Sequence, residues 1–130
     1  MQVKKQQLEL DMEQQTGSKL GYDPDLAIEN YTHAIEINPD YFDAIYNLGA
    51  LYITMSNKLK AQANEITGFS KAEIEQYDAL IAQAEELLRT GLPYVEQAYK
   101  AQPTDEVKSV LKTMYVQLKM FDEAKALDAE

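Results

Sequence analysis

The sequence has no cysteine, one histidine and no tryptophan among its 130 residues. Without cysteine, the chain can form no disulfide, no thiolate metal site and no thiol nucleophile. A single histidine leaves little material for a histidine-rich metal centre. The sequence also lacks any run of about 18 apolar residues, so no segment is predicted to span a bilayer. These absences disfavour several classes of enzyme and of membrane protein.

Positive charge is scarce as well. Lys and Arg number 12 against 22 Asp and Glu, which gives a net charge of −10. Nucleic acids and anionic membranes bind cationic surfaces, so neither is an expected partner. Residues 22–57 carry no Lys or Arg and six acids, Asp23, Asp25, Glu29, Glu36, Asp40 and Asp43. This stretch is either a solvated helical face, which is the more frequent case, or a surface that attracts basic partners.

The first residues, from Met1 to Lys5, are not followed by an apolar stretch. The sequence as written therefore shows no signal peptide, and a cytoplasmic location is expected. An exported location stays open if a leader has been removed.

Glycine (5) and proline (4) are few, and they fall where helices should begin or end. Asp23–Pro24 is typical of a helix start, with an N-cap followed by proline at the first helical position. Ser70 to Glu73 has the capping-box pattern, and Thr104 precedes two acids at another expected start. Apolar residues between these signals recur at steps of three and four, and no segment shows the alternation of a strand. The sequence predicts one all-α domain over residues 1–130.

Apolar stripes give the expected extent of each helix. The first stripe consists of Leu26, Ala27, Tyr31, Ala34, Ile35 and Ile37. The expected boundaries that follow are Asn38–Pro39, Thr67–Phe69, Gln102–Pro103 and Phe121. Asp40 is expected to cap the second helix. Pro93 lies within the long third helix and is expected to kink it or divide it in two.

The same residue spacings occur twice along the chain. Steps of four, three and five residues separate Ala27, Tyr31, Ala34 and Pro39, and likewise Gly91, Val95, Ala98 and Pro103. Leu48 and Tyr52 are spaced as Leu111 and Tyr115 are. Small residues at such positions let antiparallel helices approach closely, while larger ones fill the gap to the next pair.

On these residues the sequence resembles the tetratricopeptide repeat (TPR) family. That pattern places Leu-Gly and Tyr on a first helix, then Ala, an aromatic residue, Ala and Pro on a second. The resemblance covers residues 22–55 and 91–126, whereas residues 1–21 match the first helix poorly. It implies a solenoid of antiparallel helix pairs with about 2.5–3 repeats and one elongated pair.

The middle repeat is too long for this pattern. Leu48 and Leu111 stand 63 residues apart, whereas successive TPR repeats are about 34 residues apart. The sequence predicts that the excess is an inserted hairpin extension at residues 57–85, because both flanking stripes continue into it. Such a hairpin would protrude about 20 Å beyond the solenoid.

No set of residues predicts catalysis. Glu29 and His33 are four residues apart, but a metal site would need further ligands. The glycines do not form a phosphate-binding loop, and no nucleophile is matched with a base. We therefore expect no enzyme, no metal site and no cofactor.

The resemblance implies a concave groove, formed by the first helix of each pair, that receives a peptide or a partner helix. Its expected residues are Asp43, Tyr46, Asn47, Ala50 and Thr54 in one repeat and Glu106, Ser109, Thr113 and Gln117 in the next. Asp43 and Glu106 would repel a C-terminal carboxylate, so a basic or amphipathic segment is the better ligand. The alternative for Tyr46 and Asn47 is a role in packing or interhelix hydrogen bonding.

The leading hypothesis is a non-enzymatic scaffold for a protein or peptide partner of unknown identity. A second hypothesis is a self-assembling module, in which a homodimer forms through open solenoid ends or through the protruding hairpin. In a third, these residues are a piece of a longer TPR protein.

Overall fold

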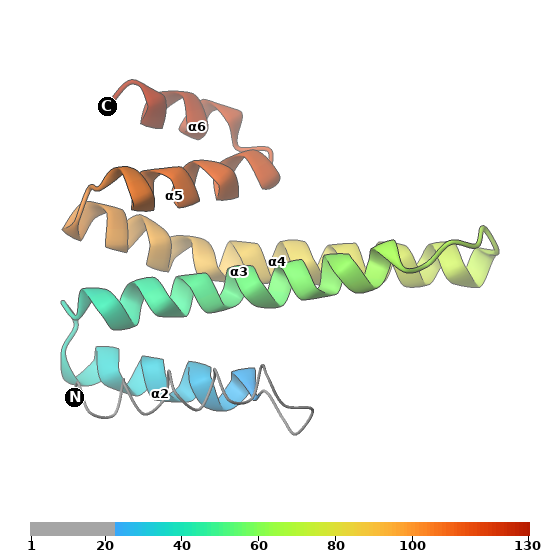
Figure 1. Cartoon of the computed structure of the whole chain (residues 1–130), viewed down its shortest axis with the longest axis horizontal. Helices are drawn as coiled ribbons and strands as arrows, with labels where there is room; N and C mark the ends of the chain where they lie inside the picture. Colours follow the sequence, from blue (N-terminus) through green and yellow to red (C-terminus); the bar gives the residue numbers. More distant parts are fainter. Residues whose placement is uncertain (1–22) are drawn as a thin grey trace.

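A computed structural model describes residues 23–130 of the chain. This part consists of five α-helices without a strand: α2 (Pro24–Ile37), α3 (Phe42–Asn64), α4 (Lys71–Ala101), α5 (Asp105–Gln117) and α6 (Phe121–Asp128). The helices follow one another in chain order, and each packs on its sequence neighbour (Figure 1). The prediction of an all-α, TPR-like arrangement is confirmed here. The poorly matching first helix predicted at residues 1–21 lies outside the described residues.

Three helix starts form at the caps that the sequence predicts. The Asp23 carboxylate accepts a hydrogen bond from the Leu26 N–H at 3.1 Å, and Pro24 occupies the first position of α2. The Ser70 hydroxyl accepts one from the Glu73 N–H at 3.2 Å. Thr104 Oγ1 caps α5 in the same way. Each cap satisfies an N–H that has no partner within its helix.

The expected cap at Asp40 is wrong. Helix α3 begins at Phe42, and its N-cap residue Tyr41 makes no side-chain cap hydrogen bond. The backbone N–H of Asp40 instead donates to Asn38 Oδ1 at 3.3 Å, and the N–H of Tyr41 donates to the Asn38 carbonyl at 3.0 Å. Asp40 therefore belongs to the turn before α3, which Asn38 organises.

Of the two outcomes expected at Pro93, the division of the helix is wrong, since α4 is a single helix from Lys71 to Ala101. A kink at Pro93 stays a prediction. Proline cannot donate to the carbonyl four residues earlier, that of Arg89. Both Pro93 and Arg89 are exposed. Meanwhile Leu88 and Val95 are buried on the other face. Packing on both sides of the proline holds the helix together, and the freed carbonyl lies on the solvent side.

Helices α3 and α4, with 23 and 31 residues, are the longest. Residues 65–70 join the two helices, and this turn contains the boundary expected at Thr67–Phe69. Helix α3 ends at Asn64, three residues before Thr67. The far half of this pair extends well beyond the other described helices (Figure 1). We call residues 57–85 the outer hairpin.

Small residues bring α3 and α4 close together. At intervals of seven residues, both helices bury small side chains: Gly49, Ser56 and Ala63 on α3, and Ala84, Gly91 and Ala98 on α4. A Cβ atom added to Gly91 would lie 2.6 Å from the Cβ of Tyr52. The buried Ser56 hydroxyl donates a hydrogen bond to the Ala84 carbonyl at 2.7 Å. The repeated spacings found in the sequence include Gly91 and Ala98 but not Ser56 or Ala63.

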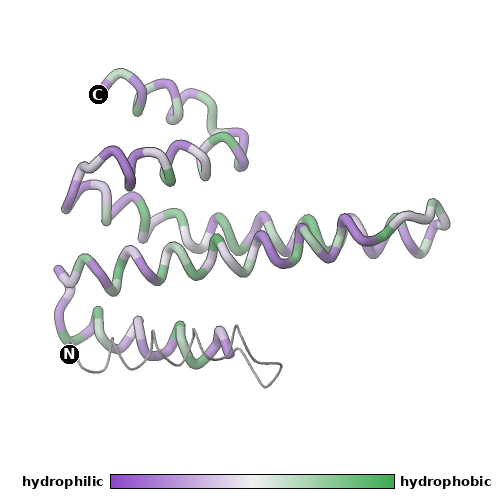
Figure 2. The backbone as a smooth tube through the Cα atoms, viewed as in Figure 1, coloured by the Kyte–Doolittle hydropathy of each residue, from purple (hydrophilic) through white to green (hydrophobic). Residues whose placement is uncertain are grey.

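Two hydrophobic clusters form the core. One joins α2 to α3 around Ala27, Tyr31 and Leu48, and the other joins α3, α4, α5 and α6 around Ile45, Leu88, Val95, Leu111 and Leu127. Figure 2 shows hydrophobic positions recurring between hydrophilic ones along the helices. Two residues of the first predicted stripe lie outside this core, because Leu26 is 48% and Ile37 58% exposed.

Candidate partner-binding surface

The residues expected to line the groove lie on two helices. Asp43, Tyr46, Asn47, Ala50 and Thr54 belong to α3, and Glu106, Ser109, Thr113 and Gln117 belong to α5. Tyr46, Asn47 and Ala50 are half-buried, whereas the other six are exposed. We call these nine residues the α3–α5 face.

Tyr46 of α3 lies within electrostatic range of Glu106 on α5. The pKa of Tyr46 is raised above 10.0, first by burial and then by the negative charge of Glu106. A negative charge near the phenol disfavours its ionised form, which is why Glu106 adds to the effect of burial.

Tyr46 also packs within the fold. Its ring stacks on that of Phe42, with centroids 5.7 Å apart and planes inclined by 8°. Both rings lie against the larger core cluster. The packing role that the sequence left open for Tyr46 is therefore present, while part of the side chain remains accessible.

Two threonines of the α3–α5 face use their hydroxyls locally. Thr54 Oγ1 donates to the Ala50 carbonyl at 3.1 Å, and Thr113 Oγ1 donates to the Ser109 carbonyl at 3.0 Å. What these side chains offer a ligand is therefore an acceptor oxygen and a methyl group rather than a donor.

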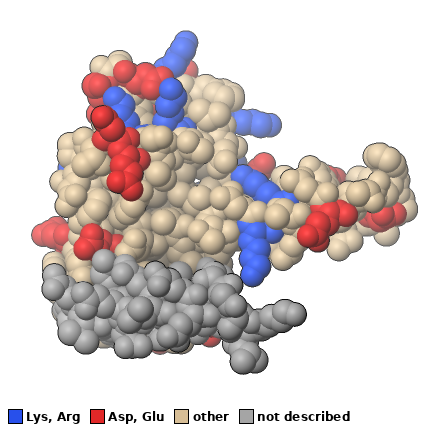
Figure 3. Space-filling model, in the orientation of Figure 1, with Lys and Arg blue, Asp and Glu red and all other residues tan. Residues whose placement is uncertain are grey.

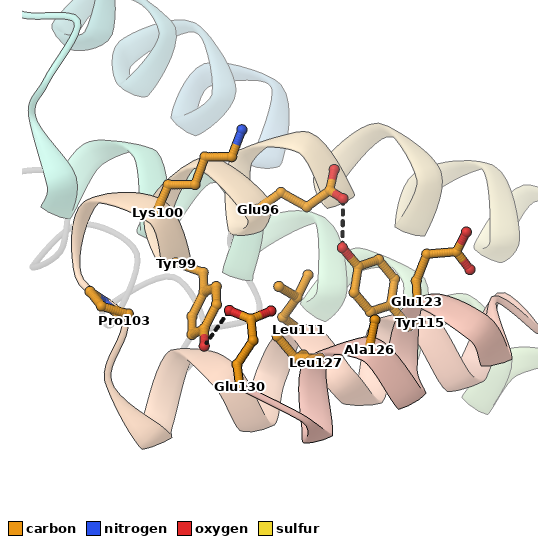
Figure 4. Close-up of a pocket in the computed structure, with 10 residues that line it drawn as sticks. All are labelled: Glu96, Tyr99, Lys100, Pro103, Leu111, Tyr115, Glu123, Ala126, Leu127 and Glu130. Atoms are coloured by element: carbon orange, nitrogen blue, oxygen red, sulfur yellow. Dashed lines mark hydrogen bonds between the residues drawn. The ribbon is translucent and has the colours of Figure 1, made fainter.

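A second surface feature, which the sequence did not predict, is an open cavity of about 470 Å³ between α4, α5 and α6 (Figure 4). Its lining comprises Glu96, Tyr99, Lys100, Pro103, Leu111, Tyr115, Glu123, Ala126, Leu127 and Glu130. Three carboxylates face one lysine in this set, so the cavity is acidic. The lining comes from three helices and from Pro103 and Glu130 next to them, and its acids look like ordinary surface residues in the sequence.

Hydrogen bonds from two tyrosines cross this cavity. The Tyr115 hydroxyl donates to Glu96 Oε2 at 2.6 Å, and the Tyr99 hydroxyl donates to Glu130 Oε1 at 3.4 Å (Figure 4). Burial raises the pKa of Tyr115 well above 10.0, and the hydrogen bond to Glu96 raises it further. Tyr115 therefore stays neutral in the folded protein at pH values where a free tyrosine ionises.

This pKa predicts a loss of stability in alkaline solution. Unfolded Tyr115 ionises near pH 10, but the folded side chain keeps its proton, so folding becomes less favourable as the pH rises above about 10. Tyr115→Phe removes the ionisable phenol. The free energy of unfolding of this variant should therefore fall less steeply with pH, by up to about 1.4 kcal/mol per pH unit. Urea unfolding between about pH 8 and pH 11 measures it. Tyr77→Phe, at an exposed position, is the control, and equal declines in both variants would contradict the prediction.

Comparison with known proteins finds a family match in helices α2 and α3. The family model of the TPR repeat matches residues 24–56, which comprise α2 and about the first two thirds of α3. No curated protein matches the chain, and no solved structure does. Residues 24–56 are therefore similar to a TPR repeat, and they include Ala34, Pro39, Leu48 and Tyr52, on which the resemblance seen in the sequence rests. The helices that follow continue a TPR-like, all-α arrangement.

Two further features bear on the class of function. None of the helices between residues 23 and 130 has the length and hydropathy needed to cross a membrane. In the same range, no three His, Asp or Glu side chains are placed to hold a metal ion. TPR repeats generally mediate contacts between proteins, through the extended surfaces that stacked helix pairs create. The fold thus supports a function in protein–protein interaction.

Proposed function

We propose that this protein is a non-enzymatic interaction module that binds a basic or amphipathic segment of a partner protein across the α3–α5 face. The observation that carries the proposal is the position of Tyr46, which is half-buried on α3 and packs against the core cluster that contains Val107 and Leu111 of α5. Glu106, on the same α5 helix, adds a negative charge within electrostatic range of the Tyr46 phenol. The TPR match over residues 24–56 supports the same class of function.

The chemistry of the α3–α5 face suits a cationic ligand. Glu106 is exposed, and a Lys or Arg of the partner can pair with its carboxylate. The Tyr46 and Phe42 rings offer an apolar and aromatic surface beside it, on which a guanidinium or an apolar side chain can pack. A ligand ending in a carboxylate would meet repulsion from Glu106, which favours internal or helical segments over free C-terminal tails.

Binding of fluorescently labelled peptides to the full chain tests this proposal. The panel contains amphipathic helical peptides rich in Lys and Arg and the same peptides with Glu in place of the basic residues. We expect only the basic peptides to bind, with an affinity that falls as salt is added. Glu106→Lys should weaken binding about tenfold or more, which corresponds to about 1.4 kcal/mol.

A matched control is Glu123→Lys, which changes the net charge equally but lies at the cavity between α4 and α6. Both variants should retain the circular dichroism spectrum of the parent. If Glu123→Lys weakens binding and Glu106→Lys does not, the ligand occupies the cavity and the proposed α3–α5 face is wrong. If neither basic nor acidic peptides bind, the proposed ligand class is wrong.

A further inference from the structure

The outer hairpin exposes large apolar side chains. Phe69, in the turn, is 89% exposed, and Ile74 and Tyr77 on the first turns of α4 are 48% and 38% exposed. A hollow of about 220 Å³ lies among these residues, between the turn and α4. Isolated apolar residues on a surface are ordinary, but a cluster at the end of a projecting element marks a surface of contact.

Within the described residues, nothing covers this part of α3 and α4. The buried side chains of the outer hairpin are Ala63 and Ala84, which lie at the interface between α3 and α4. The helices α2, α5 and α6 end well short of the turn (Figure 1). A pair of helices without a third layer buries little apolar area, so a further helix packed against it would stabilise it.

Most charged residues of the outer hairpin separate by position, the exceptions being Lys71 near the tip and Glu85 near the body. Lys58 and Lys60 lie on α3 near the body of the protein, and this part of α3 carries no acid. Glu73, Glu75 and Asp78 lie on the first turns of α4, toward the tip. Figure 3 shows the same order, with positive side chains where the hairpin leaves the body and negative ones farther out.

We propose that the outer hairpin pairs with the outer hairpin of a second copy of the chain, with the two tips pointing in opposite directions. This orientation places Lys58 and Lys60 of each copy beside the outer carboxylates of the other. Because a two-fold axis relates the two copies, each of these contacts occurs twice in the dimer. Lys71, near the tip, then meets Glu85, near the body.

The opposite arrangement, with both tips in the same direction, lacks this complementarity. It would bring the outer carboxylates of the two copies together at one end and the lysines together at the other. Like charges set side by side across an interface cost affinity. The acidic tip likewise disfavours insertion of Phe69 into an anionic membrane. The charge order therefore selects a second copy in antiparallel orientation.

Charge-reversal variants of the full chain, examined by light scattering after size exclusion, test this proposal. The unmodified protein should have twice the mass of one chain at high concentration. Lys58→Glu with Lys60→Glu should raise the dissociation constant at least about tenfold, and so should Glu75→Lys with Asp78→Lys. Mixing these two double variants should restore a dimer of one copy of each, because the reversed charges again complement one another.

The matched control is Lys100→Glu with Lys125→Glu. It changes the net charge by the same amount as Lys58→Glu with Lys60→Glu, but both of its positions lie outside the outer hairpin. This control should still dimerise.

Ile74→Ser with Tyr77→Ser should weaken the dimer without charge reversal. Because both positions are exposed, this variant should remain folded. A monomeric parent protein would overturn the proposal, as would a dimer that no outer-hairpin variant weakens. Peptide binding at the α3–α5 face should be unchanged in these variants, which separates the two proposals.

Discussion

Replacement of Gly91 by valine is expected to lower the free energy of unfolding by about 3 kcal/mol. The first added carbon would lie 2.6 Å from the Cβ of Tyr52, and it would also lie 3.3 Å from the Gly49 carbonyl oxygen. The Tyr52 Cβ is bonded to the backbone and cannot rotate away. Helices α3 and α4 must therefore separate along their interface, and this loss exceeds the few tenths of a kcal/mol by which valine favours a helix over glycine.

Thr90→Val is the matched control for this change. Thr90 precedes Gly91 on the same helix but is exposed, and its hydroxyl bonds only the Glu86 carbonyl in its own helix, at 2.9 Å. Urea unfolding followed by circular dichroism measures both variants. A Gly91→Val protein as stable as Thr90→Val would show that α3 and α4 do not approach as closely as the structure has them.

Leu88→Ala is expected to cost about 2–5 kcal/mol of unfolding free energy. Leu88 is fully buried and belongs to the cluster that joins α3, α4, α5 and α6. Removing its three terminal carbons leaves a cavity, and the surrounding helices can close such a cavity only in part.

The neighbouring Leu87→Ala removes the same atoms from a half-buried position and should cost about 1 kcal/mol or less. The two variants have identical composition and helix propensity, so the difference between their unfolding free energies reports burial alone. Equal losses would mean that α4 does not present the Leu88 face to the core.

Much of the fold could be predicted because its determinants are local. The caps at Asp23, Ser70 and Thr104 depend on residues within one turn, and so sequence alone identifies them. The errors at Asp40 and Pro93 have another origin. Asn38 takes the Asp40 N–H, and packing of the opposite face of α4 keeps the helix intact at Pro93. The packing at Pro93 involves residues of other helices, so the neighbouring residues do not reveal it. The Asn38 bond spans only two residues, but Asn38 and Asp40 are both turn-forming residue types, and the local sequence does not rank them.

The candidate surface was predictable to a smaller extent. Helical spacing was enough to group the α3–α5 face on two helices, but the packing of Tyr46 against the core cluster shared with α5 appears only in the structure. The cavity beside Tyr115 is assembled from three helices, so its residues have no common spacing. Ser56 and Ala63 could have been found, because they continue the seven-residue interval that begins at Gly49.

The order in which the helices pack has a consequence for how the chain folds. Each described helix contacts chiefly the helix next to it in the sequence, so most native contacts close short loops and carry a small entropic cost. Chains of low contact order fold quickly. Among the helices between residues 23 and 130, the six residues between α3 and α4 close the largest interface. This pair can therefore serve as the nucleus onto which α2 and α5 add from either side, as repeats propagate along a solenoid.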